Sequence, residues 1–402
     1  MRLTHLSLTN FRNFTRLDLD VPSGTILLAG KNAQGKTSLL EAVYLLATLA
    51  SFHAETDRQL IHFTAAPELQ SAAHIAGEFE KNGKTHKLHV RVIQERGMDG
   101  AARLQKDARL DGLPLKLSEA VGLFNAVLFI PQMMQVIEGG PAHRRRYLDL
   151  ALAQVIPDYT AVLSAYNKVV TQRNALLKQL GEQGGDPAQL EYWDTELAGY
   201  GARLIHARIQ AVREIGALAA QTHLELTRRA EVLRMDYQPA YDPLPGAGAQ
   251  LALRIDDPKD RSGFSLEQIR QGFSEALKVV RAEEIRRGVT VLGPHRDELR
   301  FLSNATDLGS FGSRGQVRTT MLTLKLAELA WMGKKTGALP VLLLDEVLAE
   351  LDEYRRADLL GRLADCPQAL LTTADLASFE EEFVRKAAVW RVEAGRIATG
   401  AR

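Results

Sequence analysis

The eight residues from Gly30 to Thr37 have types and a spacing that suit phosphate binding. They match the pattern G-x-x-x-x-G-K-[ST], after an apolar segment and before a helical pattern. Glycines in such a loop let backbone N–H groups surround a phosphate, and the helix start adds partial positive charge. Lys36 would reach the β- and γ-phosphates, and the Thr37 hydroxyl would bind Mg²⁺. We therefore predict a nucleotide site formed by Gly30, Lys31, Asn32, Ala33, Gln34, Gly35, Lys36, Thr37 and Ser38.

Two acidic residues end an apolar run much later in the chain. Val341–Leu344 predicts a buried parallel strand, and Asp345 and Glu346 follow it directly. The carboxyl end of such a strand lies at the sheet edge that also carries a phosphate loop. We expect Asp345 to hold Mg²⁺ through water and Glu346 to polarise the attacking water, so that Lys36 and Glu346 are the catalytic candidates. The acidic strand end is a weak signal alone and a strong one downstream of a phosphate loop.

A second anion-binding turn is indicated shortly before the acidic strand. Gly312-Ser313-Arg314-Gly315-Gln316 opens a helix that we expect over 317–330. A serine and a glycine at a helix N-terminus can bind an anion through backbone N–H groups. An ordinary N-cap serine with a flexible approach explains the same residues when they are considered alone.

The segments around the phosphate loop read as strands and one helix. Leu17, Leu19 and Val21 alternate with polar residues, which is typical of a half-buried strand, and residues 26–29 suit a buried strand. After Lys36 the apolar residues recur at helical spacing: Leu39, Leu40, Val43, Leu46 and Leu49. Residues 74–93 predict a hairpin, because Asn82-Gly83 favours a type I′ turn.

The middle of the chain has helical texture. Apolar stripes run from about 150 to 235 with a glycine-rich break at 181–185, and residues 239–262 read as a connecting loop. Another capped helix is predicted to start near Ser265, with Gln268 three positions on. From 289 the α/β texture returns. We expect a discontinuous α/β head of residues 1–150 and 289–402, with a helical lobe and short arm of residues 151–288 inserted.

Composition limits the function classes. Fifty Lys and Arg stand against 49 Asp and Glu, so any nucleic-acid binding must come from local basic patches. The single cysteine, Cys366, excludes an intrachain disulfide and a cysteine-rich zinc site. No apolar run approaches the roughly 20 residues of a membrane span, and the first residues do not resemble a signal peptide. We expect a cytoplasmic protein with no membrane partner.

The order of these motifs resembles that of the ABC-type ATPases. A phosphate loop is followed by Ser-x-Gly-Gln, by an apolar strand ending in Asp-Glu, and by Glu350-Leu351-Asp352. Asn10-Phe11-Arg12-Asn13-Phe14 is similar to an N-terminal element of the SMC-like and RecF-like ATPases. The segments 141–149 and 293–297 resemble two further blocks of the RecF family. The resemblance covers essentially the whole chain and implies an ABC-type ATPase head with an inserted helical lobe.

The RecF-family resemblance implies roles for residues outside the phosphate loop. Ser313, Gly315 and Gln316 of one subunit would close over ATP bound at Lys36 of another, and Asp352 would face this interface. Arg12 would lie beside the nucleotide, and Gln132 would sense Mg²⁺ and the attacking water. Glu346 stands where the family usually has a second aspartate.

The same resemblance implies an activity and partners. It implies a weak, DNA-stimulated ATPase that forms an ATP-dependent homodimer on double-stranded DNA near gaps, is released by slow hydrolysis, and supports recombinase loading in repair and replication restart. RecR, with RecO, would be the protein partners, and the nucleoid the place of action. Two alternatives stay open: a nucleotide-gated DNA clamp with negligible hydrolysis, and the ATPase head of an SMC-like nuclease complex.

Basic clusters are the candidates for DNA contact. Lysines and arginines on one face would neutralise phosphates without reading bases, although such runs usually mark solvated helix faces. The clusters are Arg144–Arg146, Arg228-Arg229, Arg281 with Arg286-Arg287, and Lys334-Lys335.

Overall fold

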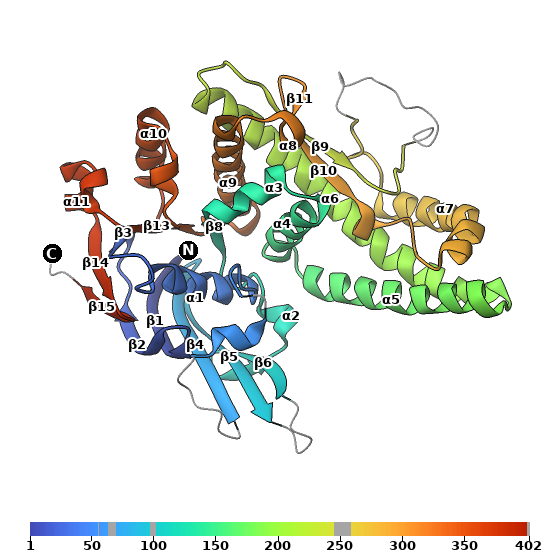
Figure 1. The fold of residues 1–402 in the computed structure, drawn as a ribbon, viewed down its shortest axis with the longest axis horizontal. Helices are drawn as coiled ribbons and strands as arrows, with labels where there is room; N and C mark the ends of the chain where they lie inside the picture. The colour runs from blue at the N-terminus through green and yellow to red at the C-terminus, as the bar shows by residue number, and fades with distance from the viewer. Residues whose placement is uncertain (55, 63–69, 97–101, 245–258, 400–402) are drawn as a thin grey trace. The chain divides into compact units, whose positions relative to one another are not determined.

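The computed structural model describes residues 1–54, 56–62, 70–96, 102–244 and 259–399. They divide into two compact units, whose helices and strands are drawn in Figure 1. The first unit comprises Met1–Met133 and Glu328–Arg402, and the second comprises Met134–Ala327.

An antiparallel six-stranded sheet forms one layer of the first unit, in the order β2-β1-β4-β5-β6-β7. The predicted hairpin is confirmed, because β4 and β5 pair on either side of Asn82 and Gly83, whose φ angles are 53° and 76°. The strands are β1 (Arg2–Phe11), β2 (Phe14–Asp20), β4 (Gln70–Lys81), β5 (Lys84–Arg96), β6 (Ala102–Leu110) and β7 (Leu113–Leu115).

The other sheet of the first unit is mostly parallel, in the order β15-β14-β3-β13-β12-β8. Only its edge strand β15 pairs antiparallel. Since β3, β13 and β12 run in the same direction side by side, their carboxyl ends lie at one edge of the sheet. The strands are β3 (Gly24–Ala29), β8 (Ala126–Phe129), β12 (Val341–Leu344), β13 (Gln368–Thr373), β14 (Ala388–Glu393) and β15 (Arg396–Thr399).

The helix after the phosphate loop, α1 (Lys36–Thr48), lies between these two sheets. It contacts β4 and β5 of the antiparallel sheet and β8, β12 and β13 of the parallel one. A helix covered on both sides must be apolar nearly all round. Its leucines, alanines and Val43 accordingly join the core cluster of the unit, and Glu41 is the carboxylate buried among them.

Shorter elements complete the first unit. They connect strands or cover the parallel sheet: η1 (Asp57–Leu60), α2 (Leu117–Ala120), η2 (Pro131–Met134), η5 (Val347–Glu350), α10 (Glu353–Leu363), η6 (Leu376–Ser378) and α11 (Glu381–Lys386).

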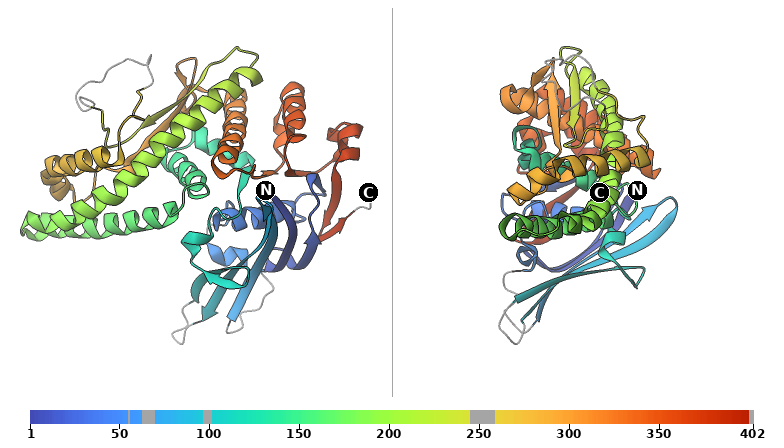
Figure 2. Two further views of the ribbon diagram at one scale, coloured as in Figure 1. Left: turned by 180° about the vertical axis from the view of Figure 1, so that it is seen from behind. Right: turned by 90° about the vertical axis from the view of Figure 1, so that its right-hand side faces the viewer.

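Three long helices pack against one another in the second unit: α5 (Tyr159–Gln183), α6 (Leu190–Leu226) and α7 (Leu266–Arg287). Figure 2 shows α5 and α6 close together at the end where the chain passes from one to the other, and diverging away from that end. The break predicted at 181–185 is where α5 ends, and the short turn η3 (Pro187–Gln189) leads into α6. The capping box predicted at Ser265 is present, with reciprocal hydrogen bonds to Gln268.

The second unit also contains strands, which corrects the expectation of helix up to residue 235. Helix α6 ends at Leu226, and β9 (Leu233–Gln238) pairs with β10 (Glu298–Ser303), which pairs with β11 (Thr306–Asp307). Leu233 and Tyr237 are buried at a strand spacing, and their partners on β10 come from far along the chain. Part of the predicted connecting loop, 245–258, lies outside the described residues.

The remaining helices of the second unit are α3 (Gln135–Glu138), α4 (Pro141–Ala153), η4 (Pro294–Arg296), α8 (Leu308–Phe311) and α9 (Arg314–Thr336). Helix α9 is longer than the predicted 317–330, and its part from Glu328 onward belongs to the first unit. The units thus divide after residues 133 and 327, whereas the sequence analysis expects boundaries at 150 and 288.

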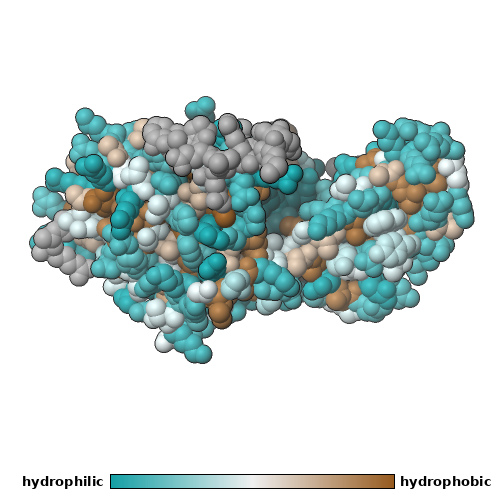
Figure 3. All heavy atoms as spheres, turned by 90° about the horizontal axis from the view of Figure 1, so that it is seen from below, coloured by the Kyte–Doolittle hydropathy of each residue, from teal (hydrophilic) through white to brown (hydrophobic). Residues whose placement is uncertain are grey.

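The face of the molecule drawn in Figure 3 is mostly hydrophilic. On the face drawn in Figure 3, apolar residues form small patches separated by hydrophilic ones. Among the described residues, none of the helices combines the length and hydropathy that a membrane crossing requires.

Candidate nucleotide-binding site

The phosphate loop lies between β3 and α1, where the backbone needs glycine. Gly35 has a φ of 115°, which L side chains rarely adopt, and a Cβ there would lie 2.5 Å from the Asn13 amide nitrogen. A Cβ on Gly30 would lie 2.3 Å from the carbonyl oxygen of Val392. The two glycines of the motif are therefore required by the fold of this loop, whatever binds in it.

Lys36 is buried within the loop it follows. Its side chain is 4% exposed, and Nζ donates to the carbonyl oxygens of Gly30 and Lys31 at 2.5 and 3.2 Å and to Asn32 Oδ1 at 3.4 Å. All three acceptors are uncharged. The carboxylate of Glu346 lies 3.7 Å from Nζ, and its side chain is 43% exposed. The ammonium charge is thus poorly neutralised, which suits an anionic ligand.

Asp345 lies at the carboxyl edge of the parallel sheet, where it accepts hydrogen bonds from residues that are far apart in the sequence. Thr37 Oγ1 donates to its carboxylate at 2.9 Å, and Thr372 Oγ1 donates to it at 2.7 Å. The residues belong to α1, to the end of β12 and to β13. A carboxylate and hydroxyls are the hard oxygen ligands that Mg²⁺ prefers, so the donor set of Thr37 and Asp345 fits this ion.

The backbone of Glu346 is held in place, and its side chain is partly exposed. Its φ of 53° is in the left-handed region, and its N–H donates to Thr372 Oγ1 at 2.9 Å. The turn directs the chain from β12 into η5 while the carboxylate stays partly exposed at the cleft. This arrangement allows the carboxylate to accept a proton from a water molecule bound there.

One cleft of about 570 Å³ contains most of the predicted site residues. Of these, Arg12, Asn32, Ala33, Gly35, Lys36, Thr37, Ser38, Gln132, Asp345 and Glu346 line it. The sequence analysis did not assign a role to five other lining residues, namely Asn13, His53, Gln59, Ile61 and Pro131. Nothing in their positions along the sequence indicated that they line the cleft, although Asn13 lies within the N-terminal element Asn10–Phe14.

Arg12 lies in the cleft in a bidentate ion pair with Glu41. Arg12 Nε and Nη2 donate to the two carboxylate oxygens at 2.6 and 2.8 Å, and Nη1 donates to the carbonyl oxygen of Gln59 at 3.0 Å. Ser51 also hydrogen-bonds Glu41. The sequence analysis missed Glu41, yet one carboxylate in the apolar pattern of residues 39–47 is a signal that it must be buried and paired.

Four predicted residues of the first unit do not line the cleft. Gly30 and Lys31 contribute carbonyl oxygens to Lys36 instead. Gln34 supports the loop from behind, because its carbonyl oxygen accepts from Asn13 and its side chain accepts from Ala394 N at 2.8 Å. Asp352 caps α10, where its side chain accepts from Arg355 N at 2.9 Å.

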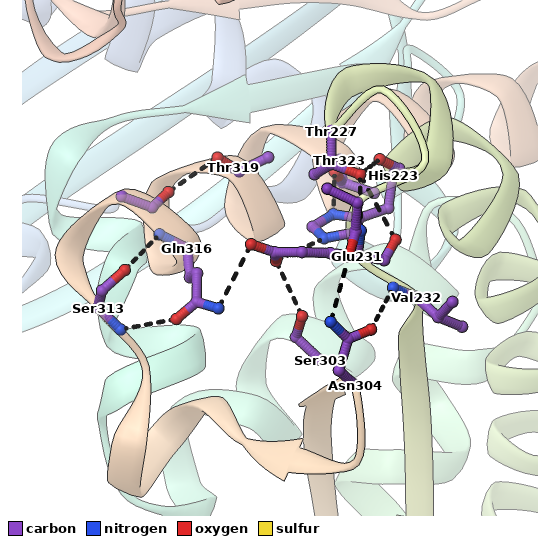
Figure 4. Close-up of polar contacts among 12 residues, drawn as sticks. His223, Thr227, Glu231, Val232, Ser303, Asn304, Ser313, Gln316, Thr319 and Thr323 are labelled. Atoms are coloured by element: carbon purple, nitrogen blue, oxygen red, sulfur yellow. Dashed lines mark hydrogen bonds and ion pairs between the residues drawn. The ribbon is translucent and has the colours of Figure 1, made fainter.

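The second anion-binding turn belongs to the second unit and forms a capping box. Ser313 Oγ accepts from Gln316 N at 3.2 Å, and Gln316 Oε1 accepts from Ser313 N at 3.0 Å (Figure 4). A Cβ on Gly315 would have only Ser313 Oγ within 4 Å, at 3.9 Å, among the described residues. Packing within the chain therefore does not require a glycine at 315.

Three arginines from two of the basic clusters make hydrogen bonds or ion pairs within the second unit. Arg144 makes a bidentate ion pair with Glu298, at 2.6 and 2.9 Å, and Arg145 donates to the carbonyl oxygen of Asp297 at 2.8 Å. Arg281 donates to Asp194 at 2.7 Å. Because these three guanidinium groups already have partners within the chain, they are weaker candidates for DNA contact.

The blocks at 141–149 and 293–297 meet around one buried arginine. Arg208 of α6 donates to Asp149 and to Asp297, both at 2.8 Å, and to the carbonyl oxygen of Pro294. Burial by itself lowers the pKa of Arg208, but the neighbouring carboxylates, Asp149 foremost, more than offset this and hold it above its usual value. Both blocks thus supply structural ion pairs.

His295 likewise has a structural contact, since its Nδ1 lies 2.7 Å from the Tyr166 hydroxyl. Within the described parts of the chain, His, Cys, Asp and Glu side chains form no group of three or more that could hold a metal ion.

Comparisons with known proteins agree on one family. The model of the RecF/RecN/SMC N-terminal domain matches residues 2–396. A protein of Chloroflexus aggregans named DNA replication and repair protein RecF is 39% identical over 410 residues, covering 100% of both chains. A protein of the same name from Lacticaseibacillus casei is 36% identical over 400 residues, covering 99% of this chain and 100% of the relative.

Solved structures show the same similarity in three dimensions. The recombination mediator protein RecF-ATPrS in the RecFOR pathway has a TM-score of 0.82 and 29% identity, covering 100% of this chain and 98% of that one. An SMC head bound to the C-terminal winged-helix domain of ScpA has a TM-score of 0.50 and 14% identity. The fold is therefore the ABC-type ATPase head that these proteins share, as the order of motifs predicts.

Proposed function

The chain belongs to the RecF family of DNA replication and repair proteins, and from this premise we propose that it is an ATP-dependent, DNA-binding recombination mediator. The observation that supports the proposal best is the cleft in which Lys36, Thr37, Asp345 and Glu346 come together. A related solved structure is named RecF-ATP, so the nucleotide we propose for this cleft is ATP.

We assign each residue of the cleft a role. Lys36, buried among carbonyl oxygens, would exchange these acceptors for the β- and γ-phosphate oxygens. Thr37 and Asp345, with Gln132 nearby, would hold Mg²⁺, which neutralises phosphate charge when bound. Glu346 would orient and deprotonate the attacking water, and Arg12 would lie beside the nucleotide. With these roles the chain would hydrolyse ATP, and we propose, from the family resemblance, that the hydrolysis is slow and stimulated by DNA.

We further propose that ATP joins two copies of this chain head to head on double-stranded DNA. Ser313 and Gly315, with Gln316, would close over the γ-phosphate held at Lys36 of the other copy, and Asp352 would face the interface. The open space around Gly315 supports this role, because packing within one copy does not explain the glycine. Hydrolysis would then release the dimer from DNA.

The dimer would act near gaps in DNA in the cytoplasm, at the nucleoid. We propose RecR, with RecO, as partners in loading the recombinase, since the similar solved structure is described within the RecFOR pathway. Of the basic clusters, Lys334-Lys335 in the last turn of α9 and Arg228-Arg229 remain candidates for phosphate contact.

Light-scattering mass measurement tests the dimer. We expect monomer without nucleotide or with ADP, and dimer with ATP and Mg²⁺. Ser313→Arg places a bulky cation where the γ-phosphate should be covered and should abolish the ATP-dependent dimer. Ser164→Arg, at an exposed serine of α5, is the matched control and should dimerise like the wild type. If the wild type has the same mass without nucleotide, with ADP and with ATP and Mg²⁺, the proposal is wrong.

Hydrolysis distinguishes this function from a DNA clamp with negligible turnover. Glu346→Gln keeps the size of the side chain and removes the proton acceptor. For a working ATPase cycle we expect the variant to accumulate as an ATP-bound dimer on DNA, with phosphate release reduced about 100-fold or more. If wild type and variant dissociate from DNA at the same rate, hydrolysis plays no part in release and the clamp is the better description.

A further inference from the structure

A carboxylate in the second unit connects three separate segments beneath the Ser313 turn. Glu231 lies between α6 and β9, and its Oε2 accepts from Ser303 Oγ at 2.8 Å and lies 3.3 Å from His223 Nε2. Its Oε1 accepts from Gln316 Nε2 at 3.4 Å. Figure 4 shows Glu231 between these three side chains.

The charge of Glu231 determines which way the Gln316 amide faces. Burial raises the pKa of Glu231, but hydrogen bonds from Ser303, His223 and Gln316 together outweigh this and keep it below its usual value. An ionised carboxylate can only accept hydrogen bonds, so the NH₂ group of Gln316 must face it. The carbonyl oxygen of that amide must therefore face Ser313 N, as the 3.0 Å distance shows.

Gln316 holds Ser313 by two hydrogen bonds: its side-chain oxygen, in this orientation, accepts from Ser313 N and so fixes the Ser313 backbone, and its own backbone N–H donates to the Ser313 hydroxyl oxygen. Ser313 Oγ accepts from the Gln316 backbone N–H, so the proton of the hydroxyl points elsewhere. It is then available to donate to an anion in front of the helix. The neighbouring Gly315 leaves that side of the turn open.

Helix α9 is held at a second point on the same face. His223 Nδ1 lies 3.0 Å from Thr323 Oγ1, and both side chains are fully buried. Gln316 and Thr323 are seven residues apart, which places them on one face of the helix, two turns from each other. The pair Glu231 and His223 therefore resists rotation of α9 about its own axis.

A second capping box in the same unit shows that helix capping does not require such a carboxylate. Ser265 and Gln268 make the same two reciprocal hydrogen bonds at the start of α7. In the part of the chain that the structure describes, Gln268 has no acidic partner. The additional contact at Gln316 thus needs a different explanation.

We propose that Glu231 is a positioning residue, which holds Gln316 and through it Ser313 in the orientation that donates to the γ-phosphate of ATP bound by another copy. This inference depends on the proposed function for its ligand. Its structural part, the control of the first turn of α9 by Glu231, does not.

A double-mutant cycle tests the contact between Glu231 and Gln316. Gln316→Glu retains an acceptor for Ser313 N but puts two carboxylates against each other, and Glu231→Gln combined with it restores a hydrogen bond of reversed direction. We expect each single variant to raise the ATP concentration for half-maximal dimer formation. The double variant should need about fivefold less ATP than the product of the single effects predicts. Purely additive effects would overturn the proposal.

Hydrogen exchange provides a readout that does not depend on dimer formation. In the monomer without nucleotide, Glu231→Gln should speed exchange in residues 313–319 and leave the start of α7 at Ser265 unchanged. Equal exchange in wild type and variant would overturn the positioning role. If the wild type fails to dimerise with ATP while exchange changes as expected, the proposed function is wrong and the control of this turn by Glu231 stands.

Discussion

Two regions of the molecule bury a cation in opposite ways. Lys36 in the nucleotide cleft donates to three uncharged acceptors, and the carboxylate of Glu346 lies 3.7 Å away. Arg173 in α5 of the second unit is fully buried, and it donates to Asp194 at 2.8 Å and to Glu284 at 2.6 Å. The first cation keeps an unmatched charge beside a cleft, whereas the second is neutralised where it lies.

The difference teaches how to separate a binding cation from a structural one. Burying a charge costs free energy that a paired carboxylate offsets, so a buried cation without such a partner marks a place where a ligand supplies the negative charge. By this criterion Arg208 and Arg144 are structural like Arg173. The criterion explains why family blocks that are rich in arginine can hold the fold together without touching nucleotide or DNA.

The largest expected effect comes from removing the structural cation. Arg173→Met leaves Glu284 and Asp194 buried with fewer partners, and we expect the free energy of unfolding to fall by about 3–5 kcal/mol. Urea unfolding followed by circular dichroism measures this. Arg287→Met is the control on α7, because its ion pair with Glu283 is exposed and should contribute at most about 0.5 kcal/mol. A loss below about 1 kcal/mol for Arg173→Met would contradict the structural assignment.

Removing the binding cation should act on ligand affinity and spare the fold. Lys36→Met removes a charge that is poorly neutralised, so we expect ATP affinity to fall about 100-fold, or about 2.7 kcal/mol. The urea midpoint should stay the same or rise. Titration calorimetry measures the affinity, and Lys84→Met, at an exposed lysine of β5 outside the phosphate loop, should change it little. If Lys36→Met lowers the urea midpoint and leaves ATP affinity unchanged, Lys36 is a structural cation like Arg173.

The position of Lys36, the cation that we propose binds phosphate, was easier to predict from the sequence than the partners of the buried arginines. The loop from Gly30 to Thr37 is a local pattern that can be recognised from the spacing of its residues. Its two glycines are required by the backbone geometry of the loop. Asp345 was predictable too, because parallel strands place their carboxyl ends at one edge. The chain topology therefore brings Thr37 and Asp345 together although 308 positions separate them.

The partners of buried side chains were not predictable in the same way. Arg208 meets Asp149 and Asp297 through the packing of α6 on segments far away in sequence, and Glu231 meets Gln316 across 85 positions. A single sequence shows that a charge in an apolar pattern needs a partner but does not identify it. The strand β9 was missed for a related reason, since its pairing partner β10 follows some sixty positions later.

A smaller effect is expected where a buried carboxylate sits beside the cleft. Glu41→Gln removes the charge that holds Arg12, and we expect a loss of about 2 kcal/mol in the free energy of unfolding. ATP affinity should also decrease, by several-fold, because Arg12 is no longer fixed at the cleft. Glu80→Gln is the matched control, since Glu80 accepts both its bonds from Arg2 and its side chain is 46% exposed, so its loss should change stability little. Unchanged stability in Glu41→Gln would show that this pair is not structural.

The smallest effect is expected at the two capping boxes. They allow a direct comparison of a structural site with a proposed binding site, because both have the same motif. Ser265→Ala and Ser313→Ala each remove the side-chain acceptor of a Ser-x-x-Gln capping box, so each should lower the free energy of unfolding by about 1 kcal/mol. Only Ser313→Ala should also weaken ATP-dependent dimer formation in light scattering, since of the two turns it is the one at Ser313 that we propose to meet the γ-phosphate held by another copy. If both variants dimerise like the wild type, Ser313 is a helix cap like Ser265, and the anion-binding role of the turn has to be carried by its backbone N–H groups.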